Sequence, residues 1–141
     1  MVKINHFMRS LFFVSILVGI LFSTTIALGN NFEDTPENVM QYYFNALKNG
    51  DTETIITLLT DPILNNRRLL LEKNTAYPEH LRNYYQNANM FITDKTLSDD
   101  GNVCTITTNI FFESGGNPLI IQFYLKNTSE GWKISEEFTM E

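Results

Sequence analysis

Three strand-like segments in a row, within residues 102–138, constrain the fold of this chain more than any other feature. In each segment apolar residues alternate with mostly polar ones, and short polar turns that contain glycine separate the segments. Successive side chains of a strand point to opposite faces, so each segment has one apolar face. The apolar positions are Cys104, Ile106, Ile110 and Phe112, then Leu119, Ile121, Phe123 and Leu125, then Trp132, Ile134 and Phe138. The pattern predicts an antiparallel meander whose apolar face other elements must cover.

The segments upstream of the meander predict helices that supply this cover. A helix should begin at Thr35-Pro36, with a capping threonine and a proline in the first turn, and end at Asn49-Gly50. Further predicted elements are helices over residues 52–59 and 63–72, a helix from residue 77, and a first strand over residues 90–97. Because the helices come first and the strands last, the sequence predicts an α+β fold with about four antiparallel strands.

Residues 1–29 have the layout of an export signal. Lys3, His6 and Arg9 precede a mostly apolar stretch over residues 11–22, and small residues follow it. We therefore expect a cleaved signal peptide and a single domain over residues 30–141, exported to the periplasm or out of the cell. The alternative is an uncleaved N-terminal membrane anchor, because residues 11–28 together are nearly long enough to span a bilayer.

Charge and cysteine content exclude several classes of partner. Lys3 and Arg9 would leave with the signal, which takes the formal charge from −6 to −8. An acidic domain without a basic stripe argues against nucleic acid, and against an anionic membrane once the signal is cleaved. Cys104 is the sole cysteine and is predicted to be a buried structural thiol. The chain lacks paired histidine or cysteine spacings and glycine-rich phosphate motifs, so no metal and no cofactor is expected.

A set of short motifs lies along residues 35–141: Thr35-Pro36-Glu37, Val39, Tyr42, Tyr43, Leu47, Asn49-Gly50-Asp51, Leu58-Leu59, and Gly131-Trp132-Lys133-Ile134. In this order they resemble the nuclear transport factor 2-like superfamily, a group of cone-shaped α+β domains that includes the cystatin-like and SnoaL-like folds. The resemblance implies a curved antiparallel sheet that wraps around a long first helix and leaves a cavity at its wide end. Members include isomerases, dehydratases, cyclases and transport adaptors, so the resemblance implies a fold and a cavity rather than one activity.

Aromatic residues are the candidate ligand-binding groups of such a cavity: Tyr42, Tyr43, Tyr84, Tyr85 and Trp132. A catalytic base is harder to find. Glu136 is a candidate because it shares the strand parity of the apolar residues before it, and burial would raise the pKa of its carboxyl. The alternative is that a bulge or the end of the strand lets Glu136 reach water. Asp94 is the second candidate base, and Tyr43 the candidate hydrogen-bond donor.

Because the sequence offers no clear set of catalytic residues, it favours a non-enzymatic exported domain. Such a domain would bind an apolar small ligand or a protein partner, through the cavity or the sheet face. A homodimer through the open sheet face is also expected. The alternative is an isomerase or dehydratase of the ketosteroid-isomerase type, with Glu136 or Asp94 as base and Tyr42 or Tyr43 as donor to an enolate oxygen. A third alternative is a structural, envelope-associated role. An acid beside the Tyr43 hydroxyl would favour the enzyme, whereas a wholly apolar cavity would exclude it.

Overall fold

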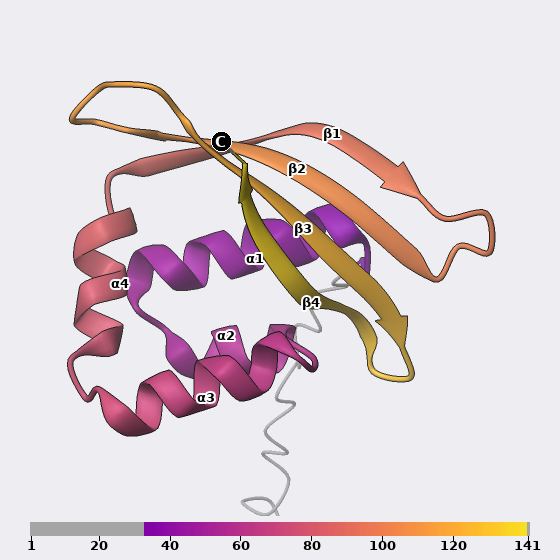
Figure 1. Cartoon of the computed structure of the whole chain (residues 1–141), viewed down its shortest axis with the longest axis horizontal. Helices are drawn as coiled ribbons and strands as arrows, with labels where there is room; N and C mark the ends of the chain where they lie inside the picture. The colour runs from indigo at the N-terminus through magenta and orange to yellow at the C-terminus, as the bar shows by residue number, and fades with distance from the viewer. Residues whose placement is uncertain (1–32, 141) are drawn as a thin grey trace, which may run out of the picture. The chain divides into compact units, whose positions relative to one another are not determined.

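The computed structural model describes residues 33–140, so the predicted signal peptide lies outside the described residues. Four helices precede four strands in the chain (Figure 1). They are α1 (Pro36–Asn49), α2 (Thr52–Leu58), α3 (Ile63–Lys73), α4 (Tyr77–Tyr85), β1 (Ala88–Leu97), β2 (Val103–Phe112), β3 (Leu119–Thr128) and β4 (Gly131–Met140). The strands form one antiparallel sheet in the order β1-β2-β3-β4. The predicted α+β class and the meander are confirmed. Within residues 33–140 no helix has the length and hydropathy to cross a membrane.

Helix α1 forms where the sequence predicts it. The Thr35 side chain accepts a hydrogen bond from the backbone N–H of Asn38 at 3.3 Å, and Pro36 occupies the first turn. Gly50 ends the helix in the left-handed conformation, with φ of +63°. The buried face of α1 consists of Val39, Met40, Tyr43, Phe44, Ala46 and Leu47. This face supplies the cover that the apolar side of the sheet requires.

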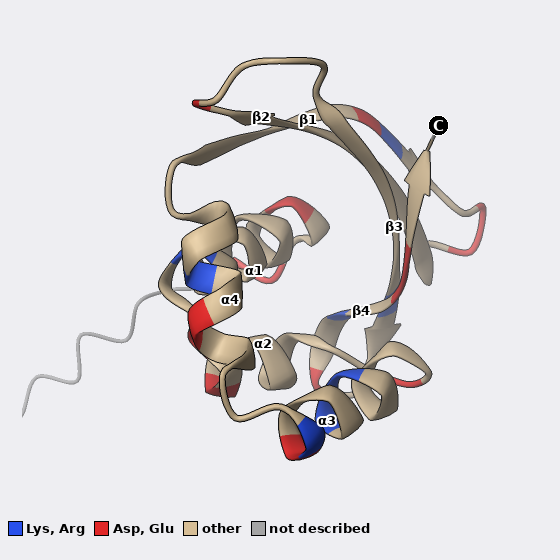
Figure 2. Ribbon diagram, turned by 60° about the vertical axis from the view of Figure 1, so that its left-hand side comes forward, with Lys and Arg blue, Asp and Glu red and all other residues tan. Residues whose placement is uncertain are grey.

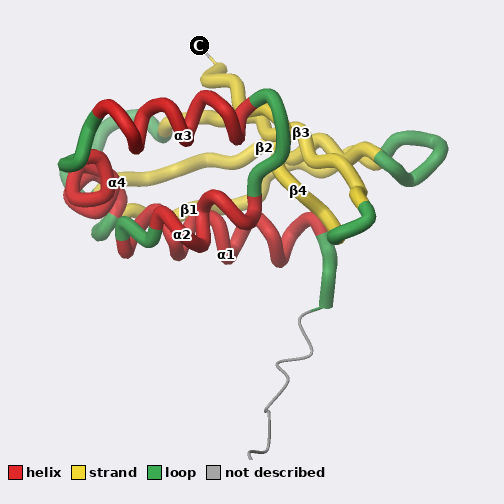
Figure 3. The backbone as a smooth tube through the Cα atoms, turned by 90° about the horizontal axis from the view of Figure 1, so that it is seen from below, coloured by secondary structure: helices red, strands yellow, loops and turns green. Residues whose placement is uncertain are grey.

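The sheet curves over the helices, and all four helices of the described residues lie on its concave side (Figure 2). The inner faces of β2 and β3 carry the predicted apolar residues, which are buried: Cys104, Ile106, Ile110, Ile121, Phe123 and Leu125. Helix α4 bridges α1 and α3 at one end of the domain (Figures 1 and 3). Residues of these three helices and of β3 and β4 line one cleft of the domain.

A β-bulge in β4 reverses the side-chain alternation that the sequence predicts there. Tyr124 pairs with Glu136 whereas Leu125 pairs with Ile134, so Ser135 is the extra residue of β4. The Ser135 hydroxyl is buried and donates to the carbonyl oxygen of Tyr124 at 3.0 Å. Beyond the bulge the inner face belongs to Glu137. The prediction that Phe138 faces the core is therefore wrong: Phe138 lies on the outer face and is 49% exposed.

The bulge also decides between the two interpretations of Glu136. Because Glu136 pairs with Tyr124 on the outer face, it does not point into the apolar interior, and the bulge alternative is the correct one. Next to the bulge, the segment between α2 and α3 is attached to β4: Leu59 forms a parallel bridge with Ile134, and the Thr60 N–H donates to the Ile134 carbonyl at 2.8 Å. These bonds fix the start of α3 beside β4.

Candidate functional site

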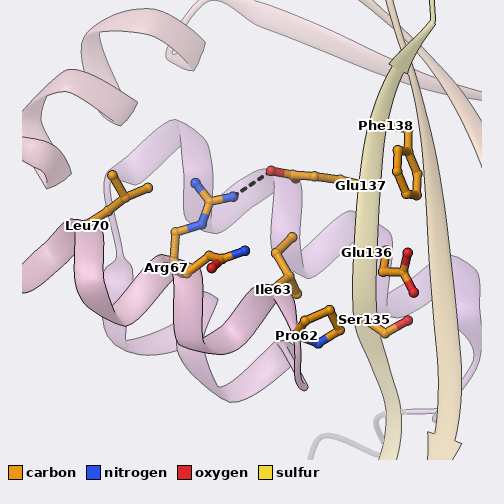
Figure 4. A pocket seen from close by; sticks show the side chains of 9 residues that line it. Pro62, Ile63, Arg67, Leu70, Ser135, Glu136, Glu137 and Phe138 are labelled. Carbon is orange, nitrogen blue, oxygen red and sulfur yellow. Dashed lines mark hydrogen bonds and ion pairs between the residues drawn. The ribbon is translucent and has the colours of Figure 1, made fainter.

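Two clefts meet at one ion pair between α3 and β4. The first, which we name the rim cleft, has a volume of about 350 Å³ and lies along β4, with Ile63, Leu70 and Phe138 among its lining residues (Figure 4). The second, which we name the tyrosine cleft, has a volume of about 500 Å³ and lies between α1, α3, α4 and the strands β3 and β4. Arg67 and Glu137 are the two residues that line both clefts. They form the wall between the clefts.

Four residues from four elements form a polar cluster in this wall, which we name the Arg67 cluster: Tyr43, Arg67, Tyr77 and Glu137. Arg67 Nη2 donates to Glu137 Oε1 at 2.9 Å and to the Tyr43 hydroxyl at 3.1 Å, and Nη1 donates to the Tyr77 hydroxyl. The Tyr43 hydroxyl donates to Glu137 Oε2 at 3.2 Å. The Arg67 side chain is 11% exposed and the Glu137 side chain 36%. The guanidinium is thus fixed inside the domain, while its carboxylate partner reaches water.

Burial sets the protonation of the groups around this cluster. Burial raises the pKa of the Tyr43 hydroxyl well above its ordinary value, and the charge of Glu137 raises it further. Burial, followed by the same charge, raises the pKa of Tyr85 to about 12. For Arg67 burial acts to lower the pKa, but Tyr43, Glu137 and Tyr77 together raise it above its ordinary value. At neutral pH both tyrosines are hydrogen-bond donors and Arg67 is a cation.

Spare donors face the clefts. The three hydrogen bonds of Arg67 use Nη1 and Nη2, and its Nε bonds to no other described residue. The Tyr85 hydroxyl likewise bonds to no other described residue, and neither of these two atoms is sealed from solvent. A guanidinium offers five N–H groups in a planar fork that suits a carboxylate. The site therefore has hydrogen-bond donors that a ligand could use.

The structure brings together three of the five candidate ligand-binding residues. Tyr43, Tyr84 and Tyr85 line the tyrosine cleft, with Tyr85 in edge contact with both Phe44 and Tyr84. The other two lie elsewhere and line neither cleft. Tyr42 is an exposed residue of α1, and Trp132 is buried in the core near the start of β4. The backbone N–H of Trp132 donates to Asp34 Oδ1 at 3.1 Å.

Neither predicted base reaches Tyr43. Asp94 follows a bulge in β1, pairs with Thr107 and lies exposed on the outer face of the sheet. Glu136 lines the rim cleft on the side of β4 opposite to Glu137, as Figure 4 shows. The acid beside the Tyr43 hydroxyl is Glu137, whose strand parity alone would place it on the face opposite to Trp132 and Ile134.

Arg67 and Arg68 are adjacent in α3, and two neighbouring charges in a predicted helix indicate a solvated helical face. Arg68 is exposed, as this pattern predicts. Arg67 is buried because it lies one turn after Ile63, on the side of α3 that faces the domain. His80 is exposed and also lines the tyrosine cleft.

Comparisons with known proteins give a likeness of fold. No protein-family model matches the chain, and no curated protein matches its sequence. A SEC-C motif containing protein from Rhodopseudomonas palustris is 15% identical with a TM-score of 0.53, covering 77% of this chain and 80% of that one. A domain from Thiobacillus denitrificans, assigned as a calcium/calmodulin-dependent protein kinase type II association domain, is 11% identical with a TM-score of 0.51, covering 74% and 93%.

A third solved structure belongs to a protein assigned as a dehydratase of the NTF2-like family from Streptomyces avermitilis. It is 20% identical with a TM-score of 0.45, and the match covers 70% of this chain and 88% of that one. The first two likenesses, at TM-scores of 0.53 and 0.51, place four helices and a curved antiparallel sheet among known α+β folds.

Proposed function

We propose that this chain is an exported member of the nuclear transport factor 2-like superfamily whose domain binds a small organic molecule in the tyrosine cleft. The observation that carries the proposal is the cleft itself. It has a volume of about 500 Å³, tyrosine rings and leucine side chains in its walls, and the Arg67 cluster at one side. A concave, largely apolar site with a few convergent polar groups is the usual form of a small-molecule site.

Superfamily membership and export have separate support. The first helix, the Gly50 junction and the curved antiparallel sheet agree with the motifs that carry the resemblance. Export has the support of the basic start, apolar stretch and small-residue tail of residues 1–29. The molecular mass of the protein recovered from the expressing cell tests whether the signal peptide is cleaved. Loss of about 27 to 29 residues is the expected result, and retention of the full chain would favour the membrane anchor.

A thermal-shift screen of residues 30–141 against a metabolite library tests ligand binding. A ligand that binds only the folded state raises the melting temperature by an amount set by its concentration and dissociation constant. Tyr85→Ala should abolish the shift because it removes a ring from the cleft wall. Tyr124→Ala, which removes a ring from the outer face of the sheet, is the matched control and should retain the shift. A ligand whose shift survives Tyr85→Ala would not occupy the tyrosine cleft.

A proton-transfer enzyme is the second candidate, and one observation favours it. Glu137 Oε2 accepts from the Tyr43 hydroxyl at 3.2 Å, which is the pairing of acid and tyrosine that this chemistry needs. Glu137 would then be the base in place of Glu136 and Asp94. Against this role, the other oxygen of Glu137 is bound by Arg67 at 2.9 Å, so a substrate must compete with a guanidinium.

Exchange of carbon-bound protons of a bound ligand with deuterated water separates the two candidates. Binding alone predicts no exchange above the rate in buffer. Exchange that the wild type catalyses and Glu137→Gln abolishes would establish the enzyme. The same exchange in a Glu136→Gln control should equal that of the wild type, because Glu136 lies on the other face of β4.

A second copy of this chain is the proposed protein partner. Exposed apolar side chains run across the outer face of the sheet: Phe91 and Phe111 in edge contact from β1 and β2, and Phe138 and Met140 from β4. No helix of the described residues covers them (Figure 2). Because a twofold axis places one patch against itself, an exposed apolar patch on a sheet suits a homodimer. Its oligomeric state in solution tests this proposal.

A further inference from the structure

We propose that the ligand of the tyrosine cleft is a monocarboxylic acid with an apolar body, whose carboxylate replaces Glu137 as the partner of Arg67. This inference rests on the proposed function and names the class of its ligand. Glu137 is then an internal substitute for the ligand, one that holds the guanidinium while the cleft is empty. Three observations lead to it: the single Lys or Arg side chain in the lining, the partly exposed position of its acid, and the chemistry of the remaining wall.

Among the described residues that line either cleft, Arg67 is the one lysine or arginine. The pairing with Glu137 leaves the guanidinium incompletely used, because the two carboxylate oxygens bind different partners, one Arg67 Nη2 and the other the Tyr43 hydroxyl. A fork of two parallel bonds from one guanidinium to one carboxylate is the stronger arrangement. A carboxylate that is free to turn can form this fork with Nε and one Nη, whereas Glu137 on its strand does not.

The position of Glu137 allows its carboxylate to leave the ion pair, whereas the position of Arg67 holds the guanidinium in place. The Glu137 side chain is 36% exposed and borders the rim cleft, so its carboxylate can turn toward water on that side. The Arg67 side chain is 11% exposed and is held by two tyrosine hydroxyls. A buried guanidinium without an anion is costly, so the departure of Glu137 is favourable only when another anion takes its place. Exchange of one carboxylate for another meets this condition.

The other walls of the tyrosine cleft indicate the chemical character of the rest of the ligand. Its walls carry leucine, isoleucine and tyrosine side chains, among them Leu47, Leu81 and Ile121, which suit an apolar body. The spare Tyr85 hydroxyl is a donor that suits an oxygen of the ligand. One guanidinium balances one negative charge, so a dianion such as a phosphate monoester would carry an unpaired charge into the cleft. A neutral molecule with the same body would leave Glu137 in place.

The test compares acids with uncharged partners of the same body by titration calorimetry. The probes are 4-phenylbutyrate and decanoate, each with its alcohol, 4-phenylbutanol and decanol. Both acids should bind the wild type at least roughly tenfold more tightly than their alcohols, the ratio expected for a hydrogen-bonded charge pair. In Glu137→Gln the acids should bind more tightly than to the wild type, since the competing charge is gone, and the alcohols should bind as before. Glu37→Gln, which breaks an ion pair with Lys95 far from the clefts, should change neither.

Two variants keep the test decisive if the loss of Arg67 impairs folding. Arg67→Lys keeps the charge and removes the fork, and should reduce the preference for acids over alcohols. The double variant Arg67→Met with Glu137→Leu removes both charges together, so no charge is left unpaired, and should abolish the preference.

Alcohols that bind as tightly as acids would overturn the inference, and so would weaker binding of acids to Glu137→Gln. Failure of both acids to bind would also overturn it. A neutral compound from the thermal-shift screen whose binding Tyr85→Ala abolishes would then keep the proposed function and reject the carboxylate class. If no compound of any class bound in a manner that depends on Tyr85, both would fail.

Discussion

Replacement of Arg67 by methionine should strongly destabilise the ligand-free domain. Methionine keeps much of the apolar stem, so the change removes mainly the charge and three hydrogen bonds. Loss of one partner of a buried ion pair costs about 3–5 kcal/mol when the remaining charge stays buried. Glu137 is 36% exposed and can be hydrated. We therefore expect a loss of about 2–3 kcal/mol in the free energy of unfolding, or about 10 °C in melting temperature.

Urea denaturation followed by circular dichroism measures this loss, and Arg68→Met is the matched control. Arg68 is the next residue of α3 and is exposed, so its replacement should change the free energy of unfolding by no more than about 0.5 kcal/mol. The double variant with Glu137→Leu should recover part of the loss of Arg67→Met, because it removes the uncompensated acid. A change below about 1 kcal/mol in Arg67→Met would refute the reasoning that the Arg67 cluster holds α3 to β4.

Three further predictions concern pH, a helix junction and the outer face. Burial raises the pKa of Tyr85 to about 12 in the folded state, so the unfolded chain loses the phenol proton near pH 10 while the folded domain keeps it, and the wild type loses stability as pH rises from about 10 toward 12. Tyr85→Phe should therefore be more stable than the wild type over this pH range and equally stable at pH 7. Alkaline denaturation measures this difference, and identical curves for the two proteins would contradict the burial of Tyr85. Gly50→Ala should cost more than Gly101→Ala in chemical denaturation, although both positions have positive φ. A Cβ at Gly50 would lie 2.3 Å from the Pro78 carbonyl oxygen, whereas one at Gly101 meets no described atom within 4 Å. Finally, Phe111→Asp should convert the expected dimer of residues 30–141 into a monomer in sedimentation experiments, whereas a wild type that remains monomeric at high concentration would reject the dimer.

Local signals explain why much of the fold could be predicted from the sequence. The threonine cap, the proline at position 36 and the glycine at position 50 act within one helix turn, and α1 has the predicted bounds. The parity of β2 and β3 is equally local, since neither strand contains a bulge in its pairing with the other. Their apolar positions, from Cys104 to Leu125, lie on the inner face as predicted.

The Arg67 cluster could not be predicted in this way because its members meet only in the folded domain. Tyr43 and Glu137 are 94 residues apart in the chain, and Arg67 and Glu137 are 70 apart. The bulge at Ser135 then exchanged the roles of Glu136 and Glu137, and strand parity carries no information on a bulge. A signal was present in the sequence: continued alternation after Ile134 would bury the carboxylate of Glu136, which is rare for an unpaired acid.

NMR measures directly where a ligand binds on this domain. The protein over residues 30–141, with its arginine Nε atoms labelled by ¹⁵N, would be titrated with 4-phenylbutyrate. We predict a large shift of the Arg67 Nε–H signal, together with nuclear Overhauser contacts from the phenyl ring of the probe to Tyr85 and Leu81. An unchanged Arg67 signal, with contacts to Phe91 and Phe111 of the outer face instead, would contradict the assignment of the tyrosine cleft as the binding site.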